Sequence, residues 1–180
     1  MTLTEHAIAA PLELARAQVL PEWIDYNRHM MDGYYAVAFS RATDAFMDYI
    51  GLDASYRTAT HGTIYTAEMH LTYLRELKEG ARLRFTTQLL GSDVKRIHVF
   101  HCMYTANADY LAATSEWMLL HVDQALGRVV PMPEHVTARL AQIMEAHAAL
   151  PRPAQAGRAV SMERGRAKDD PSATTAEGLG

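Results

Sequence analysis

The sequence predicts an α+β fold in which an antiparallel sheet lies against one long buried helix, with a second helix near the C-terminus. Three observations lead to this class. Apolar residues recur at helical spacing in residues 33–50, alternate with polar residues in segments of residues 63–122, and recur at helical spacing in residues 134–148. Only short turn sequences separate the alternating segments, which favours antiparallel neighbours over parallel strands joined by helices.

Composition places the chain among ordinary soluble globular domains. Its 180 residues suit a single domain, and 49% hydrophobic with 21% charged residues is enough to form a core. A formal net charge of -4 argues against a nucleic-acid partner. No apolar run reaches the roughly 20 residues that a membrane-spanning helix needs, and the N-terminus lacks the features of a signal peptide. We therefore expect no membrane partner and a cytoplasmic location.

The first part of the domain is predicted to be a strand followed by the long helix. Residues 1–11 are expected to form a flexible arm, and residues 12–20 form a strand that Pro21 ends. The helix has Asp32 as its expected N-cap and Gly51 as its C-terminal stop. Its apolar stripe consists of Tyr35, Ala38, Phe39, Ala42, Phe46 and Tyr49. Because most of the opposite face is also apolar, we expect a largely buried helix.

Four strands are predicted after a connection at residues 52–62. Their ranges are 63–74, 81–90, 96–104 and 110–122. Glycine, asparagine and aspartate residues in the gaps supply the turns. The short gaps predict an antiparallel meander, and the last strand, apolar on nearly both faces, is expected to be a buried interior strand.

The C-terminal part is predicted to be one helix and a tail. Pro131 and Pro133 precede a helical pattern over residues 134–148. Residues 149–180 are rich in small, polar and charged types, so we expect a disordered tail and a folded domain over residues 12–148. The helix covers only one face of the sheet, which predicts that a partner subunit covers the rest.

The candidate site is a cluster of polar residues between the first strand and the long helix. It contains a carboxylate, an amide and an imidazole, Asp25, Asn27 and His29. A carboxylate can attack a carbonyl or activate water, and the unpaired N–H groups at the helix start, near residues 32–34, can hold the resulting oxyanion. The alternative is that the acid and the amide only form loop hydrogen bonds, as these residues often do.

This cluster resembles that of the hotdog-fold acyl-CoA thioesterases of the 4-hydroxybenzoyl-CoA thioesterase type. Members commonly carry Asp-x-Asn-Gly-His-Met-Asn followed by a tyrosine in the helix. The matching residues are Asp25, Asn27, His29, Met30 and Tyr35. The chain departs from the pattern at Arg28, which replaces glycine, and at Met31, which replaces asparagine. We expect these two departures to alter the loop and the entrance of the site.

Three further segments resemble the betainyl-CoA thioesterase branch, which acts in bacterial carnitine breakdown. They are residues 65–70, 95–101 and 118–123. The resemblance implies a hotdog fold, hydrolysis of a short acyl-CoA such as betainyl-CoA, and a homodimer or dimer of dimers. It implies no cofactor, since CoA is part of the substrate. It also makes Asp25 the expected nucleophile or base, with Asn27 and His29 assisting it.

The expected substrate contacts follow from that resemblance. A betainyl group carries a quaternary ammonium, which aromatic faces attract, and the candidate rings are Trp23, Tyr26, Tyr34, Tyr35 and Tyr65. Glu68 is a candidate second carboxylate, and Glu76 is a weaker one because its charged neighbours are typical of ordinary surface. The candidate CoA contacts are Arg28, Arg57, Lys95 and Arg96. The alternatives are that the rings belong to the core and that the charged residues are solvated surface.

Two other functions share the predicted fold. One is a hydratase or dehydratase that acts on the acyl chain, and the other is a domain that binds acyl-CoA without turnover. The altered positions Arg28 and Met31 keep the second alternative open. No metal is expected, because no set of histidine, cysteine and acidic residues has suitable spacing, and His98 and His101 belong to opposite faces of one strand.

Overall fold

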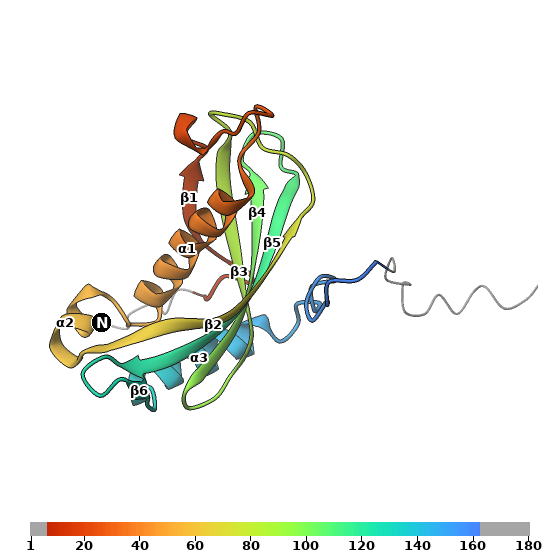
Figure 1. Ribbon diagram of the computed structural model, residues 1–180. Coiled ribbons are helices and arrows are strands. Elements are labelled where there is room, and N and C mark those ends of the chain that lie inside the picture. The colour runs from red at the N-terminus through yellow and green to blue at the C-terminus, as the bar shows by residue number, and fades with distance from the viewer. Residues whose placement is uncertain (1–6, 163–180) are drawn as a thin grey trace, which may run out of the picture.

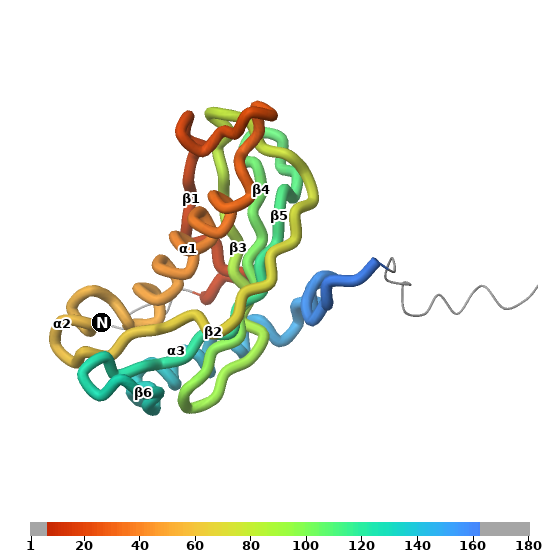
Figure 2. Tube along the Cα trace, viewed as in Figure 1, coloured from red at the N-terminus to blue at the C-terminus, as the bar shows by residue number. Residues whose placement is uncertain are grey.

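The computed structural model describes residues 7–162, and Figures 1 and 2 show the course of the chain. In chain order its elements are β1 (Leu12–Gln18), the 3-10 turn η1 (Pro21–Trp23), α1 (Asp32–Tyr49), α2 (Ala54–Thr60), β2 (Gly62–Tyr73), β3 (Arg82–Ser92), β4 (Arg96–Thr105), β5 (Leu111–Asp123), β6 (Arg128–Val129) and α3 (Glu134–His147). The predicted α+β class is confirmed: one curved antiparallel sheet partly encloses the long helix α1 (Figure 1). None of the described helices is both long and apolar enough to span a bilayer.

The order of the strands differs from a simple meander. Strands β3, β4 and β5 are consecutive neighbours, as predicted, but β2 pairs with β5 instead of β3, giving the order β1-β3-β4-β5-β2. Residues 74–81 therefore cross from the edge strand β2 to β3, which lies next to the opposite edge strand β1. Three strand spacings of about 4.8 Å separate β2 from β3, and eight extended residues reach about 27 Å. The buried Leu77, which is 0% exposed, anchors this crossing segment to the domain.

Helix α1 packs its predicted stripe into the sheet, but its other face is open. Ala38, Phe39, Ala42 and Phe46 are completely buried, whereas Val37 is 44% exposed and faces solvent in the single chain. The prediction of a largely buried helix is therefore only half right. Asp32 is the first helical residue and not the N-cap, because Met31 occupies the cap position without a side-chain hydrogen bond.

Two short elements were not predicted. Helix α2 lies in the expected connection, and its cap is Asp53, whose Oδ1 accepts a hydrogen bond from the Tyr56 N–H at 2.8 Å. Its seven residues carry no buried side chain, so there is no apolar stripe to reveal it. The second is β6, two residues that pair with the end of β5.

The first residues after α3 lie against the outer face of the sheet, where we expected disorder from residue 149. The Gln88 side chain donates to the Pro151 carbonyl at 3.3 Å, and Glu116 Oε2 accepts from the Gly157 N–H at 2.6 Å. Phe100 lies between these two anchors in the strand register and is only 2% exposed. The prediction of disorder therefore does not fit residues 149–162, and the rest of the predicted tail lies outside the described residues.

The N-terminal arm also contacts the domain where it is described. Ile8 packs against the core, and His147 Nε2 bonds the Ala9 carbonyl at 3.1 Å. The predicted flexible arm thus differs from the structure at residues 7–11, and residues 1–6 lie outside the described part. The end of α3 holds the arm in place. The imidazole of His147, which binds Ala9, is itself fixed because it accepts a hydrogen bond from the Leu89 N–H at 3.1 Å.

Candidate functional site

The predicted cluster forms a tight loop between η1 and α1. A bridge between Ile24 and Met30 brings the two ends of the loop together. Inside it, Asp25 Oδ1 accepts hydrogen bonds from the backbone N–H of Asn27 at 2.8 Å and of His29 at 3.4 Å. The Asn27 amide lies 3.4 Å from the other carboxylate oxygen. The structure thus brings the acid, the amide and the imidazole together, with the carboxylate half-buried.

Arg28 occupies the turn of this loop in a left-handed conformation, with φ of 65°. Its N–H donates to the Asp25 carbonyl at 3.0 Å, which closes the turn. This conformation favours glycine because a Cβ is strained there, which explains the glycine in the family pattern. Arg28 keeps the same loop at a cost in strain, and its side chain is exposed at the tip, outside the lining of the cavity described next.

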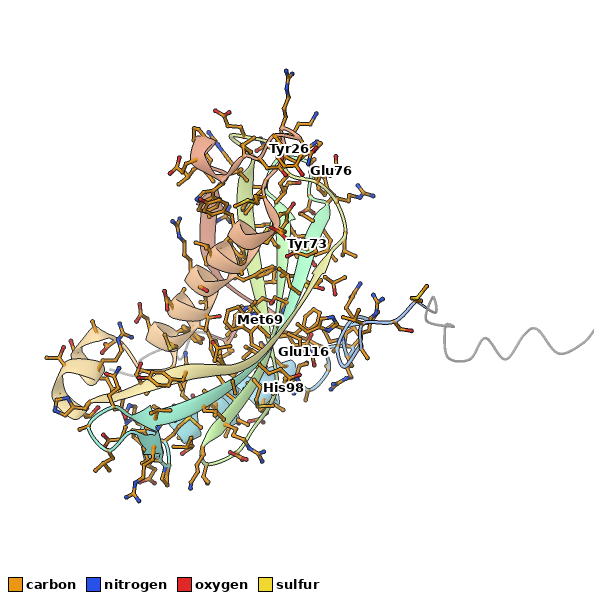
Figure 3. All side chains as sticks on the ribbon, viewed as in Figure 1. Tyr26, Met69, Tyr73, Glu76, His98 and Glu116 are labelled. Atoms are coloured by element: carbon orange, nitrogen blue, oxygen red, sulfur yellow. The ribbon has the colours of Figure 1, made fainter. Side chains whose placement is uncertain are left out.

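A cavity of about 1030 Å³ opens beside the loop. Three segments form it: the loop and the helix start, the buried ring of Tyr35, and the end of β2 with the crossing segment. The lining residues are Asp25, Tyr26, Asn27, His29, Met30, Met31, Asp32, Tyr35, Tyr73, Leu74, Arg75 and Glu76. Figure 3 shows Tyr26, Glu76 and Tyr73 at this end of the molecule.

Glu76 joins the cluster, although its sequence context made it a weaker candidate than Glu68. Its Oε2 lies 3.0 Å from His29 Nε2, so the crossing segment supplies a second carboxylate to the cavity. The charged neighbours Arg75, Lys78 and Glu79 make this stretch look like ordinary surface in the sequence. Its proximity to the loop becomes visible only when the strand order is known.

Two tyrosines form the inner wall of the cavity. The rings of Tyr35 and Tyr73 meet edge to face, with centroids 5.1 Å apart. Burial raises the pKa of Tyr35 to about 12, and burial followed by the charge of Asp32 raises the pKa of Tyr73. Both phenols are therefore neutral near pH 7, and the Tyr73 hydroxyl donates to the Asp32 carbonyl at 3.2 Å. They supply aromatic surface and hydrogen bonds to the site, not charge.

The start of α1 faces the cavity, but most of its N–H groups have partners. The Gly33 N–H donates to Asp32 Oδ1 at 2.8 Å, and the Tyr34 N–H donates to the Met31 carbonyl at 3.0 Å. Within residues 7–162, the Asp32 N–H has no acceptor. Of the three donors expected at residues 32–34, this one is available to an oxyanion, and the Gly33 N–H becomes available if the Asp32 side chain turns away.

The expected ring of aromatic residues is assembled only in part. Tyr26, which is 93% exposed, and Tyr35 line the cavity. Trp23 and Tyr34 stack on each other elsewhere, with centroids 5.5 Å apart, and Trp23 is only 3% exposed. Tyr65 lies further along β2, where its hydroxyl accepts from the Gln124 amide at 3.3 Å. Tyr73, which was not predicted, lines the cavity in place of Trp23, Tyr34 and Tyr65.

Two charged candidates are also placed away from the cavity. A bulge between Thr66 and Glu68 shifts the register of β2, so Tyr65 and Glu68 share the outer face of the sheet, whereas strict alternation would separate them. Glu68 lines a separate hollow of about 400 Å³ on that face. The guanidinium of Arg96 binds Asp93 in its own turn, with Nε to Oδ2 at 2.7 Å.

The histidines of β4 have separate environments. His98 Nε2 lies 2.7 Å from Glu116 Oε1 on the outer face. His101 lies on the inner face between Thr43 of α1 and Thr87 of β3. Among the described residues, no three histidine, cysteine or acidic side chains are grouped as a metal site would require.

The fold and the loop define a hotdog-fold enzyme whose acid lies in a cavity at the start of the enclosed helix. The comparisons with known proteins agree. The family model described as "Thioesterase-like superfamily" matches residues 19–140, and the chain belongs to this superfamily.

Named relatives and a solved structure extend this result. The chain is 47% identical over 80% of its length to a betainyl-CoA thioesterase of Pseudomonas aeruginosa, covering 91% of that protein. It is 43% identical over 87% of its length to an L-carnitine dehydrogenase/betainyl-CoA thioesterase of Rhizobium meliloti, of which it spans 31%. A hypothetical protein of Staphylococcus aureus in complex with CoA superimposes with a TM-score of 0.79 at 28% identity, covering 86% of this chain and 98% of the other.

Proposed function

We propose that the protein hydrolyses a short acyl-CoA thioester to the free acid and CoA, with Asp25 as the reacting carboxylate. The observation that carries the proposal is the position of Asp25, half-buried in a loop that lines the cavity beside the start of α1. The named relatives are thioesterases, and a structural neighbour was solved with CoA.

The reaction requires an attack on the thioester carbonyl and the departure of a thiolate. Asp25 either adds to the carbonyl, forming an anhydride that water then hydrolyses, or takes a proton from a water molecule that attacks. The Asp32 N–H, at the helix start that lines the cavity, is our candidate donor for the negative charge that develops on the carbonyl oxygen. The thiolate leaves and takes up a proton, so acid and thiol are the products in both routes. Asn27 and His29 hold the carboxylate through the loop hydrogen bonds.

The acyl group that fits best is betainyl, the group named in the relatives. Its trimethylammonium cannot form hydrogen bonds with its methyl groups, so it requires aromatic faces or negative charge. The rings of Tyr26, Tyr35 and Tyr73 line the cavity that contains Asp25. For CoA itself, the candidate cations are Arg28, exposed at the loop tip, and Arg75, which lines the cavity.

We further propose that the active form is a homodimer joined along β2. This strand pairs with β5 on one edge only, and its twelve residues leave the other edge unpaired within the described chain. Large apolar side chains are exposed along it, with Tyr65 at 50%, Met69 at 38% and Tyr73 at 51%. An unpaired strand with exposed apolar residues suits pairing with a second copy. Because Tyr73 also lines the cavity, such a dimer places the site beside the subunit contact.

Release of CoA thiol from a panel of short acyl-CoA thioesters, betainyl-CoA included, tests the proposed reaction. The Asp25→Asn variant is the matched control, because its amide oxygen still accepts the loop hydrogen bonds while it can no longer act as nucleophile or base. We expect wild-type turnover on at least one thioester and a loss of about 100-fold or more in kcat for the variant.

Two outcomes contradict the proposal. Unchanged kcat in a folded Asp25→Asn variant removes this carboxylate from the chemistry. Binding of acyl-CoA without thiol release by the wild type identifies a non-catalytic binding domain, and addition of water to an unsaturated acyl chain without thiol release identifies a hydratase.

A further inference from the structure

We infer that Glu76 makes the site selective for acyl groups that carry a positive charge next to the thioester. The inference rests on the proposed function and deepens it, since it names the residue that distinguishes a cationic acyl group from a neutral group of the same shape. The family pattern does not include this residue, and its sequence context gave it less weight than Glu68.

The backbone of Glu76 is held on both sides, which fixes where its side chain begins. The Tyr110 hydroxyl donates to the Glu76 carbonyl at 3.1 Å. The next residue, Leu77, is buried, and its carbonyl accepts from the Met30 N–H at 2.7 Å. The crossing segment is thereby joined directly to the loop that contains Asp25.

The Glu76 carboxylate is the acid of the cavity that local hydrogen bonds occupy least. Oδ1 of Asp25 accepts two loop N–H groups, and Oδ1 of Asp32 accepts the Gly33 N–H. Among the described residues, only His29 pairs with Glu76, through one oxygen, and the Glu76 side chain is 74% exposed. Its charge is therefore directed at whatever fills the cavity.

The positive group nearest to Glu76 in the sequence lines the same cavity but has a partner of its own. The Arg75 guanidinium carbon lies 5.2 Å from the centre of the Tyr110 ring, which gives this cation an aromatic partner of its own. The lining carries three carboxylates, of Asp25, Asp32 and Glu76, against one guanidinium and one imidazole. A cleft lined mainly by one sign of charge attracts the opposite sign.

The chemistry of the betainyl group places its charge within reach of Glu76. Its ammonium nitrogen is one methylene away from the thioester carbonyl, so it must lie close to Asp25 when the carbonyl does. His29 connects the two acids: its backbone N–H donates to Asp25 and its ring contacts Glu76. The tyrosine faces accept any apolar group of the right size, whereas the Glu76 carboxylate attracts only a positively charged one.

A pair of isosteric substrates separates charge from shape. Betainyl-CoA and 3,3-dimethylbutanoyl-CoA differ only in a nitrogen replaced by carbon, and therefore in one positive charge. We expect the wild type to prefer betainyl-CoA, and Glu76→Gln to lower the ratio of the two kcat/KM values by roughly ten-fold, as expected for two charges several ångströms apart near a protein surface. The kcat/KM for the neutral substrate should fall less than that for betainyl-CoA.

Glu79→Gln is the matched control, since Glu79 is an exposed acid of the same crossing segment that does not line the cavity. It should leave the ratio unchanged. Added salt should reduce the wild-type ratio more than the ratio of Glu76→Gln, because screening acts on the charge that the variant lacks.

Equal losses on both substrates overturn the inference, because Glu76 then acts by positioning His29 and not by selecting charge. Equal kcat/KM values of the wild type for the two substrates also overturn it. Dissociation constants for both thioesters, measured with Asp25→Asn and with Asp25→Asn/Glu76→Gln, give the same ratio without turnover. Failure of the proposed hydrolysis is thus distinguishable from failure of the charge selection.

Discussion

The backbone conformation of one residue shapes the loop that presents Asp25. Arg28 has φ of 65°, a region that costs a residue with a Cβ roughly 1–2 kcal/mol relative to glycine. Its N–H bond to the Asp25 carbonyl depends on this turn. The protein thus tolerates local strain at its candidate site, where strained residues are frequent in proteins.

Replacing this residue by glycine should stabilise the fold. We expect Arg28→Gly to raise the free energy of unfolding by about 0.5–1 kcal/mol, because relief of strain exceeds the added flexibility of the unfolded chain. Denaturant unfolding of the purified protein measures this change. Arg28→Ala is the control, because it removes the same side chain but keeps the strain. Equal stability of the two variants contradicts the explanation.

Local sequence was sufficient to predict part of the site. Asp25, Asn27 and His29 lie within five residues, and Tyr35 follows in the next helix, so their proximity requires no knowledge of the fold. Tyr73 and Glu76 reach the cavity from the far end of β2, more than forty residues later in the chain. Periodicity gives no information on which loop a distant strand end approaches, so Tyr73 was missed and Glu76 was ranked below Glu68.

At the level of elements, β2 determines the proposed assembly. We expect Met69→Lys to raise the dissociation constant of the dimer by roughly ten-fold or more. Pairing along β2 would bury the new ammonium group in a contact from which water is excluded. Sedimentation analysis over a range of protein concentrations measures the change. Activity should fall together with the fraction of dimer.

Val94→Lys provides the comparison for this experiment. Val94 is 61% exposed at the turn between β3 and β4. The substitution therefore adds the same charge at an apolar surface position away from β2. Its sedimentation should match that of the wild type. A wild-type protein that is monomeric and fully active excludes the β2 dimer.

Periodicity predicted the elements better than it predicted their arrangement. Strands β3, β4 and β5 and helix α3 lie within a few residues of the predicted ranges, since alternation and helical spacing are local signals. The partner of β2 is not a local property, and the bulge at Ala67 adds one residue that exchanges the faces of the strand. Tyr65 and Glu68 therefore share one face, although strict alternation would separate them.

At the scale of the whole molecule, one buried imidazole joins the long helix to the sheet. His101 is 0% exposed, with Nε2 3.2 Å from Thr43 Oγ1 of α1 and Nδ1 2.9 Å from Thr87 Oγ1 of β3. Phe39 and Trp117 pack against its ring, and no carboxylate of residues 7–162 contributes to its pKa. Burial lowers the pKa of His101 from its ordinary value of 6.5 to about 3.

This shift makes the fold sensitive to acid in a defined range. Above pH 6.5 the imidazole is neutral in both the folded and the unfolded chain and has no effect on the pH dependence. Between pH 6.5 and about 3 the unfolded chain binds a proton that the folded chain excludes, so stability falls by up to about 1.4 kcal/mol per pH unit. Burial lowers the pKa of His147 as well, which adds to the loss in the same direction.

Removing the buried imidazole should therefore exchange stability at neutral pH for tolerance of acid. We expect His101→Gln to lower the free energy of unfolding at pH 7.5 by about 1–3 kcal/mol, since one of the two threonine contacts is lost. The free energy of unfolding of the variant should then decline less steeply than that of the wild type between pH 6.5 and 4. Denaturant unfolding at a series of pH values measures the decline for both proteins. His70→Gln, which changes a partly exposed histidine of β2, should retain the wild-type slope. Parallel pH profiles for the wild type and His101→Gln would mean that acid sensitivity originates in other groups and that His101 is accessible to protons in the folded chain.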